Sequence, residues 1–504
     1  MKQIYQLIEN LPNFYESNKC QKVLVEFNNE EVLYIIGTVD VAVMEGSIEV
    51  WGYRMTPDTP STTLYSSGLF GLISITSSNK QKAVVLLENS KLSCKWRTFM
   101  NTYVPSFSVF EPKGTRLTPP KPIVDLEEQL GCQFDLSKLP ISNRRLIIDE
   151  QWKGFGDELL SRPVDQPMKI LFAGYQNAGK STMMCYFINK CLQKWNRILV
   201  IDFDIGQSEF FVPKCISAFI IDSPLLGPNF THLIQPYKSY FFGNTDVKSN
   251  VKLYLDIVKV LTNDITNDTN LNKLPCFINT MGFVKDEGLR ILHNLIYVTS
   301  PTDIVQLKFN EIQDLNLHSD VVNDNIGASL SYNLWYFTSL VKNKLAKAPF
   351  LKDCDKLNKQ YLVTASYFSK CLQNTDVYFS DVTPYRVNIC SIVINITDID
   401  ELTQEELLDI ISANVIALCV SNSEKPCECV GFGFVRNVNK VTGDLYINTP
   451  VIPYILKQVN QIQLGKLTLP TTFYTKGIQI FRYVSLKKDN VFNEIVKRQH
   501  KVML

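Results

Sequence analysis

The stretch FAGYQNAGKST, from Phe172 to Thr182, decides the fold of this chain. It follows the apolar run KILFA, leads into KSTMMCYFINKCLQKW, and is succeeded by RILVIDFD. Strand, glycine loop, helix and strand in this order make a βαβ unit, which is typical of a parallel sheet covered by helices. We therefore predict an α/β core built around this stretch.

The stretch also matches G-x-x-x-x-G-K-[ST], the phosphate-binding P-loop. Its glycines let the loop curl so that backbone N–H groups point at phosphate oxygens, while Lys180 reaches the β- and γ-phosphates and Ser181 coordinates Mg²⁺. A chance match is disfavoured by the strand before it and the helix after it. The predicted nucleotide-binding residues are Gly174, Tyr175, Gln176, Asn177, Ala178, Gly179, Lys180, Ser181 and Thr182.

Two acids end the next predicted strand, at Asp202 and Asp204. A carboxylate at the C-terminal end of the strand adjacent to the loop can hold Mg²⁺ or its water, or accept a proton from an incoming hydroxyl. A lone Asp here would be read as a strand-end turn, but two acids favour function. We predict that Lys180, Asp202 and Asp204 are catalytic and that Ser181 and Asp202 bind the metal.

ATP is favoured over GTP as the nucleotide. No Asn/Thr-Lys-x-Asp element for guanine occurs in a suitable place, and Asp204-Ile-Gly206 is one residue short of a D-x-x-G switch.

The length of 504 residues predicts more than one core. Residues 22–55 alternate apolar and polar residues in short runs broken by Gly37, Gly46 and Gly52, which indicates hairpin strands. We predict a β-sandwich-like N-terminal domain with a connecting helix (1–150), a P-loop kinase domain with a parallel sheet and flanking helices (151–385), and a smaller α+β, β-rich C-terminal domain (386–504). Further strands are expected at 216–221, 276–280 and 303–307, and a surface loop at TNDITNDTNLNK from Thr262.

Composition excludes few functions but constrains them. A net charge of +1 and a pI near 7.4 give no global signature of nucleic-acid binding, so any polyanion site must be local. Thirteen cysteines without CxxC pairing indicate reduced, mostly buried thiols. No apolar run reaches the roughly 18 residues of a membrane helix, and the start lacks a signal-peptide pattern, so we expect a soluble intracellular protein without a membrane partner.

Motifs beyond the P-loop resemble the polynucleotide 5′-hydroxyl kinase family, and its nucleolar ribosomal-RNA-processing branch in particular. They are DFDIGQSEFFVPKCISAF, SPLLGPNFTH, INTMGFVKDEG, SPTDIVQ and, near the C-terminus, VGFGFVRNV with LYINTPV. The resemblance implies phosphorylation of RNA 5′-hydroxyl ends with ATP and Mg²⁺ during processing of ribosomal RNA precursors. It also implies a HEPN-type endoribonuclease partner and a nuclear, nucleolar location.

The same resemblance identifies Asn279–Phe283 as the family's clasp, usually N-T-x-G-W, whose aromatic ring stacks on a terminal base. Here Phe283 stands in place of Trp, so we expect weaker stacking, although an aromatic after a strand can also be an ordinary core residue. The candidate substrate-binding residues are Gln207, Thr280, Gly282 and Phe283.

The family's lid arginine has no counterpart, because the sequence between Ser300 and Tyr385 contains no arginine. Three alternatives stay open: a lysine substitutes, Arg290 or Arg386 serves, or catalysis is reduced. Reduced catalysis motivates a second hypothesis, an ATP-locked non-catalytic scaffold subunit of an RNA-cleavage complex. His232 is interpreted as a structural histidine. The lysines of this region are Lys342, Lys344, Lys347, Lys352, Lys356 and Lys359.

Overall fold

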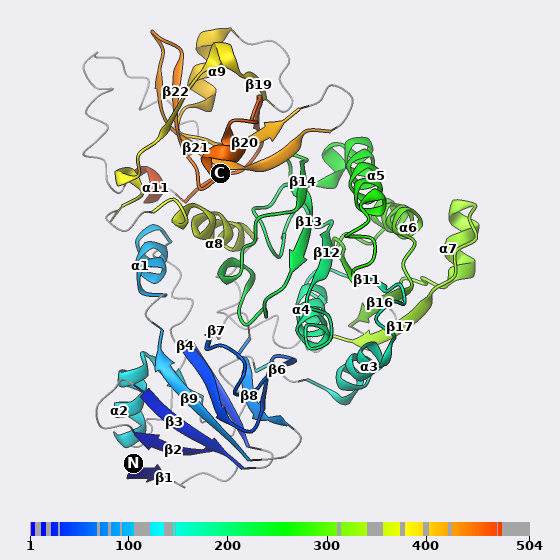
Figure 1. Cartoon of the computed structure of the whole chain (residues 1–504). Coiled ribbons are helices and arrows are strands. Elements are labelled where there is room, and N and C mark those ends of the chain that lie inside the picture. The colour runs from blue at the N-terminus through cyan, green and yellow to red at the C-terminus, as the bar shows by residue number, and fades with distance from the viewer. Residues whose placement is uncertain are drawn as a thin grey trace.

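The structure is a computed structural model of the whole chain (Figure 1). It describes residues 2–5, 12–16, 22–28, 31–67, 71–78, 82–90, 93–104, 121–135, 145–146, 148–309, 314–339, 356–372, 378–396, 403–421, 426–470 and 472–475.

A mixed sheet covered by helices forms the centre of the molecule. Along β11, Ile170 and Phe172 point into the core that contains α4, while Leu171 and Ala173 point into the core beneath α5 and α6. This alternation of two apolar faces makes β11 an interior strand with helices on both sides. The strands are β11 (Lys169–Gly174), β12 (Ile198–Asp202), β13 (Cys215–Ile221), β14 (Lys238–Phe241), β15 (Cys276–Asn279), β16 (Asp303–Lys308) and β17 (Asn333–Thr338).

The order of the strands is β17-β16-β11-β15-β12-β13-β14. The first five are parallel, and β13 and β14 continue the sheet antiparallel. The parallel P-loop core is thus confirmed, while the order of its strands is a new finding. β15 lies between β11 and β12, because it pairs with both.

Helices cover this sheet on both faces (Figure 1). Residues 262–267, expected in a surface loop, instead form the last turns of α5, where Thr262 and Ile265 are buried. The helical spacing of buried residues in α5 continues through this polar segment, so the last turns still pack against the sheet. The helices are α3 (Glu150–Ser161), α4 (Lys180–Cys191), α5 (Val251–Asn267), α6 (Glu287–Thr299), α7 (Ser319–Ile326) and α8 (Lys356–Ser369).

The N-terminal domain is an antiparallel β structure, as predicted, organised on the long bent strand β4. Gly46 and Gly52 lie in turns with positive φ, but Gly37 lies inside β4, where Cys132 of β10 packs against it. The strands are β1 (Lys2–Tyr5), β2 (Asn13–Glu16), β3 (Lys22–Phe27), β4 (Val32–Glu45), β5 (Ile48–Val50), β6 (Tyr53–Met55), β7 (Thr62–Ser66), β8 (Ser74–Ser77), β9 (Ala83–Asn89) and β10 (Cys132–Phe134), with helices α1 (Ser93–Tyr103) and α2 (Lys121–Leu130).

The C-terminal domain is a smaller α+β unit whose strands continue the central sheet. Tyr240 of β14 pairs with Glu428 of β21, and the Phe241 N–H donates to the Cys427 carbonyl at 3.1 Å. Figure 1 shows β21 beside β14. Its elements are β18 (Tyr385–Asn388), β19 (Val393–Ile396), α9 (Gln404–Ile411), β20 (Val415–Val420), β21 (Glu428–Asn439), β22 (Asp444–Asn448), α10 (Pro453–Leu456), β23 (Gln461–Leu464) and α11 (Thr472–Thr475).

The structure bears on two expectations from composition, one about the cysteines and one about membrane helices. The cysteines that the structure describes are free thiols, and eight of these ten are buried. Within the same described ranges, no helix is both long enough and apolar enough to cross a membrane. The domain boundaries near 150 and 385 stay predictions.

Candidate active site

The P-loop curls at the C-terminal end of β11, where two glycines adopt backbone angles that other residues avoid. Gly174 has φ +148° and Gly179 has φ +98°. A Cβ at Gly174 would lie 2.7 Å from the Leu307 carbonyl oxygen, so that position has no room for a side chain. The loop returns at Asn177, whose φ is +61°. Gln176 and Asn177 are exposed, and Ala178 is buried beneath them.

Lys180 begins α4 and folds back over the loop. Its Nζ donates to the carbonyl oxygens of Gly174 at 3.0 Å and Tyr175 at 3.2 Å. Burial lowers the pKa of Lys180 to about 8, and the charge of Asp204 opposes this shift. Ser181 and Thr182 follow in the first turn of α4, half-buried. The nine predicted nucleotide-binding residues therefore surround one helix N-terminus, the ordinary protein site for phosphate.

Asp202 ends β12 and is held by four donors. Its Oδ1 accepts from the Asp204 N–H at 3.0 Å and from Asn279 Nδ2 at 2.9 Å. Its Oδ2 accepts from Ser208 Oγ at 3.0 Å and the Glu209 N–H at 2.8 Å. Burial, aided by the charge of Asp204, raises the pKa of Asp202 to about 7, while these donors oppose the rise. The four acceptor positions of a carboxylate are thus occupied.

Asp204 has different surroundings. It is half-buried, and its Oδ1 accepts from the N–H groups of Gly206 and Gln207, both at 2.9 Å. Within the described ranges its Oδ2 has no hydrogen bond. Asp204 also lies close enough to Lys180 for its charge to affect the lysine. The geometry therefore favours Asp204 over Asp202 as the group that meets a metal ion or a hydroxyl, and the predicted metal contact of Asp202 has no free oxygen to serve it.

Asn279 is a functional candidate that the sequence reasoning placed in the clasp without a role. It ends β15, is fully buried, and orients Asp202 through its Nδ2, while its Oδ1 has no hydrogen-bond partner among the residues that the structure describes. The signal that could have found it is an amide at the carboxyl end of a strand beside the acid-bearing strand. This signal could not be recognised from the sequence, because it depends on β15 lying between β11 and β12.

The clasp residues lie directly against the P-loop. Thr280 is buried and its Oγ1 donates to the Phe172 carbonyl at 2.6 Å. A Cβ at Gly282 would lie 2.4 Å from Gln176 Cα, so the two loops touch through backbone atoms. Phe283 is half-buried against the core beneath α5 and α6, and its ring faces Lys248 Nζ at 5.0 Å. Phe283 is therefore partly a core residue, and the hydroxyl of Thr280 is engaged in joining two strands.

Gln207 is half-buried in the turn after β12, next to Gly206, whose carbonyl accepts from Gln360 Nε2 of α8 at 2.9 Å. His232 pairs through Nε2 with Glu209 Oε1 at 3.2 Å, and Cys185 Sγ lies 3.6 Å from the same oxygen. Since Glu209 also binds Asp202 through its backbone, the pair supports the turn. A structural role for His232 fits this position.

The structure describes only some of the predicted substitutes for the lid arginine, and among them Lys359 is half-buried on α8. Lys342, Lys344, Lys347 and Lys352 lie outside the described residues, as does the side chain of Lys356. Arg386 lies on β18, paired with Asp444 of the C-terminal domain at 3.3 Å, and Arg290 is exposed on α6. The buried pair of Arg162 and Asp303, at 2.6 Å, lies at the first residue of β16, the opposite edge of the sheet from the loop.

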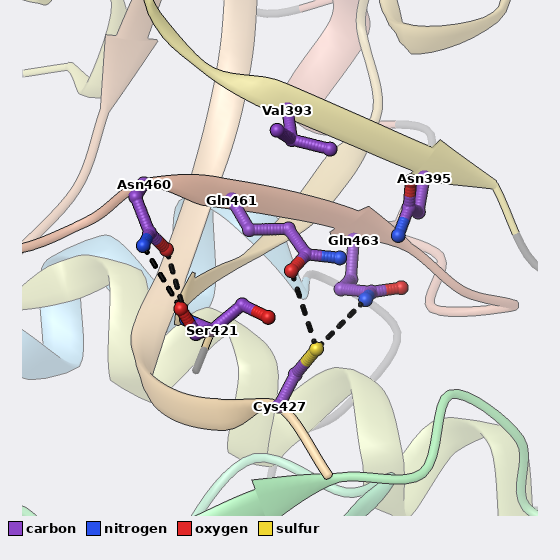
Figure 2. Close-up of a pocket in the computed structure, with 7 residues that line it drawn as sticks. All are labelled: Val393, Asn395, Ser421, Cys427, Asn460, Gln461 and Gln463. Carbon is purple, nitrogen blue, oxygen red and sulfur yellow. Dashed lines mark hydrogen bonds between the residues drawn. The ribbon is translucent and has the colours of Figure 1, made fainter. Parts of the chain in front are cut away.

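A hollow of about 460 Å³ lies elsewhere, in the C-terminal domain. Figure 2 shows its neutral lining on β19 and β23, with Gln461 and Gln463 both hydrogen-bonded to Cys427. None of its lining residues belongs to the P-loop or the acid turn, so it forms no part of this site. The lining residues are Val393, Asn395, Ser421, Cys427, Asn460, Gln461 and Gln463.

Three family models match successive parts of the chain. The model of the N-terminal domain of polynucleotide 5′-hydroxyl-kinase NOL9 matches residues 12–83. The model of the P-loop of the mRNA cleavage and polyadenylation factor CLP1 matches residues 174–331, and that of the NOL9-like C-terminal domain matches residues 380–470.

Curated proteins give the same picture. Polynucleotide 5′-hydroxyl-kinase NOL9 of Drosophila melanogaster is 26% identical over 91% of this chain and 49% of its own length. The Danio rerio protein of that name is 28% identical over 66% of this chain and 51% of its own length, and the Dictyostelium discoideum protein is 26% identical over 95% and 86%. The chain thus spans about half the length of the first two relatives. A solved structure of the Pcf11p and Clp1p interface superposes with a TM-score of 0.55 at 15% identity, covering 90% of this chain and 100% of Clp1p, which shows the fold.

Proposed function

Because this chain belongs to the polynucleotide 5′-hydroxyl kinase family, we propose that it transfers the γ-phosphate of ATP to the 5′-hydroxyl end of RNA. The observation that carries the proposal is the meeting of Lys180, Asp204 and the clasp at one edge of the sheet. A phosphate-binding loop, a carboxylate and an aromatic beside it are the parts that phosphoryl transfer to a nucleic-acid end needs.

The residues fit a magnesium ion. The Ser181 hydroxyl lies in the first turn of α4 and would supply a hard oxygen ligand, while Mg²⁺ usually keeps several of its waters, so the free Oδ2 of Asp204 stays available to the substrate hydroxyl. Mg²⁺ held there would neutralise negative charge on the transferring phosphate.

The chain's own groups then divide the work. Lys180 exchanges its two loop carbonyls for phosphate oxygens, because an ammonium binds an anion more strongly than it binds a carbonyl. Asp204 accepts the proton of the RNA 5′-hydroxyl. Asp202 and Asn279 hold the turn that carries Asp204, and Phe283 offers a ring face to the terminal base.

Three further parts of the proposal concern the cellular setting. We place the reaction in ribosomal RNA precursor processing, in the nucleolus, beside a HEPN-type endoribonuclease that makes the 5′-hydroxyl end. The NOL9 models at both ends of the chain support this choice over a messenger-RNA role. The solved Clp1p structure contains Pcf11p, so the fold is one that accommodates a protein partner.

A second candidate function is an ATP-locked scaffold subunit. It is favoured by the absence of arginine between Ser300 and Tyr385, since an arginine that clamps the transferring phosphoryl group raises kcat by about 10³ or more.

The deciding experiment is transfer of labelled phosphate from ATP to a 5′-hydroxyl oligoribonucleotide, with Lys180→Ala as the negative control and Lys153→Ala, an exposed lysine of α3, as the matched one. We expect transfer by the wild type and by Lys153→Ala only. If the protein binds ATP but transfers no phosphate with any divalent metal or at any pH tested, the kinase hypothesis fails and the scaffold hypothesis takes its place.

A further inference from the structure

Lys214 has two unfavourable features at one position. It directly precedes β13, is only 2% exposed, and its φ is +81°. Its backbone joins two loops, since its N–H donates to the Ile205 carbonyl at 2.8 Å and its carbonyl accepts from the Phe242 N–H at 2.9 Å. Its ammonium has no hydrogen bond or ion pair with any residue that the structure describes.

Neither feature serves the fold. A left-handed backbone angle costs an L-residue roughly 1 to 2 kcal/mol, which glycine avoids. A buried ammonium without a partner loses its hydration with nothing in return. Unfavourable features at one residue are typical of functional positions. Both features would be accounted for if the ammonium of Lys214 binds an anion.

A second lysine stands beside it. The Lys466 N–H donates to the Gly243 carbonyl at 3.0 Å, and the Gly243 N–H donates to the Lys214 carbonyl at 3.2 Å. Burial lowers the pKa of Lys214 to about 7, and the like charge of Lys466 contributes. Lys466 is exposed, so an anion beside the two ammonium groups would offset the burial of Lys214 and the repulsion between the two lysines.

Lys214 and Lys180 have different charged neighbours. Asp204 affects the pKa of Lys180, whereas the charge that affects Lys214 is that of Lys466. Lys214 nevertheless touches the acid turn through Ile205, the residue after Asp204. The two lysines therefore lie beside the turn that carries the proposed base, where the central sheet meets the C-terminal domain.

We propose that Lys214 and Lys466 bind a backbone phosphate of the RNA strand whose 5′-hydroxyl faces Asp204. The assignment rests on the proposed function, because it takes RNA as the substrate. A strand that leaves the active site past the acid turn brings a phosphodiester to this junction, and two lysines there supply a local polyanion contact in a chain whose net charge is only +1.

Equilibrium binding of a 5′-hydroxyl single-stranded oligoribonucleotide to the full chain tests this without requiring catalysis. The variant is Lys214→Gly, since glycine accepts the positive φ and keeps the fold. Affinity should fall about tenfold at low salt, and the slope of log K against log salt should fall by about 0.7, the value for one phosphate contact on a single strand. Lys214→Arg should keep most of the affinity, because it keeps the charge.

Lys238→Met is the matched control. Lys238 lies at the same junction but is half-exposed and paired with Glu428 at 2.6 Å, so its loss should leave both affinity and slope unchanged. An unchanged slope in Lys214→Gly would overturn the proposal, as would a loss confined to ATP affinity. A wild type that shows the Lys214-dependent slope but transfers no phosphate would leave this site standing while overturning the kinase.

Discussion

Asp202 and Asp204 are two residues apart and have opposite surroundings. Asp202 is 1% exposed and receives four hydrogen bonds, three of them from groups that can only donate. Asp204 receives two, both on the same oxygen. At the residue scale, Asp202 therefore stabilises the turn, and Asp204 is the carboxylate with an oxygen available to a ligand. The sequence predicted the pair, but it could not divide their roles, because the division depends on donors from Ser208, Glu209 and Asn279.

Changing each acid to its amide should separate these roles. Asp202→Asn places an amide NH₂ among donors, and we expect a loss of about 1 to 3 kcal/mol in the free energy of unfolding. Asp204→Asn keeps an acceptor for its two N–H partners, so stability should hold while transfer falls by about 10² or more. Thermal unfolding and single-turnover phosphoryl transfer measure the two effects. The reverse pattern would make Asp202 the base.

The depressed pKa of Lys214 predicts a pH dependence for RNA binding. With a pKa of about 7, this lysine loses its proton as the pH rises through neutrality, and the one neighbouring charge that affects its pKa is that of Lys466. An RNA phosphate favours the charged form, so binding takes up a proton and affinity falls as the pH rises from about 6 to 8. Dissociation constants should rise more steeply with pH across this range for the wild type than for Lys214→Gly. Parallel curves would show that Lys214 does not face the RNA.

At the scale of elements, β15 organises the site. It supplies Asn279 to the acid turn, and the segment after it binds β11 through Thr280 and packs Gly282 on the P-loop. The individual strands could be predicted from apolar runs, and the P-loop could be predicted from its sequence motif. Their order could not, because the βαβ unit predicts that two strands are parallel and leaves open whether a third lies between them.

Gly282→Ala tests this contact between loops. The added Cβ would meet backbone atoms of Gln176 at 2.4 and 2.6 Å, which cannot move without displacing the P-loop. We expect ATP affinity to fall about tenfold or more, measured by calorimetry. Gly154→Ala is the control, since nothing lies within 4 Å of a Cβ there, and in a helix this change is neutral or gains roughly 0.5 to 1 kcal/mol. Equal ATP affinity in both variants would show that the clasp does not position the loop.

On the scale of the whole molecule, both outer domains hold parts of the P-loop core. The β5–β6 turn docks on α4, where Asn189 Nδ2 donates to the Trp51 carbonyl at 2.9 Å and Gln193 Nε2 to the Gly52 carbonyl at 2.8 Å. From the other side, Phe432 of β21 packs on Phe211 and Phe241. The sequence predicted three domains from their local patterns. It could not predict these contacts, which join residues more than a hundred positions apart.

Phe432→Ala should loosen the whole molecule. Phe432 is 1% exposed, and its truncation leaves a cavity between two domains, so we expect a loss of about 3 to 5 kcal/mol in the free energy of unfolding. Chemical denaturation measures it, with Tyr454→Ala, at 74% exposed, as the near-neutral control. Because the two units share one sheet, the P-loop core and the C-terminal domain should lose stability together. A separate early transition of the C-terminal domain would contradict that.

The pairing of β14 with β21 also affects how the chain folds during translation. On the ribosome, β14 is made nearly two hundred residues before β21, so the growing chain carries an unpaired sheet edge and the apolar ring of Phe241 until the C-terminal domain emerges. A nascent chain stalled between them would offer that edge to chaperones or to other nascent chains. The C-terminal domain closes the sheet, and a premature stop codon before β21 would leave a P-loop core with an unpaired, aggregation-prone edge.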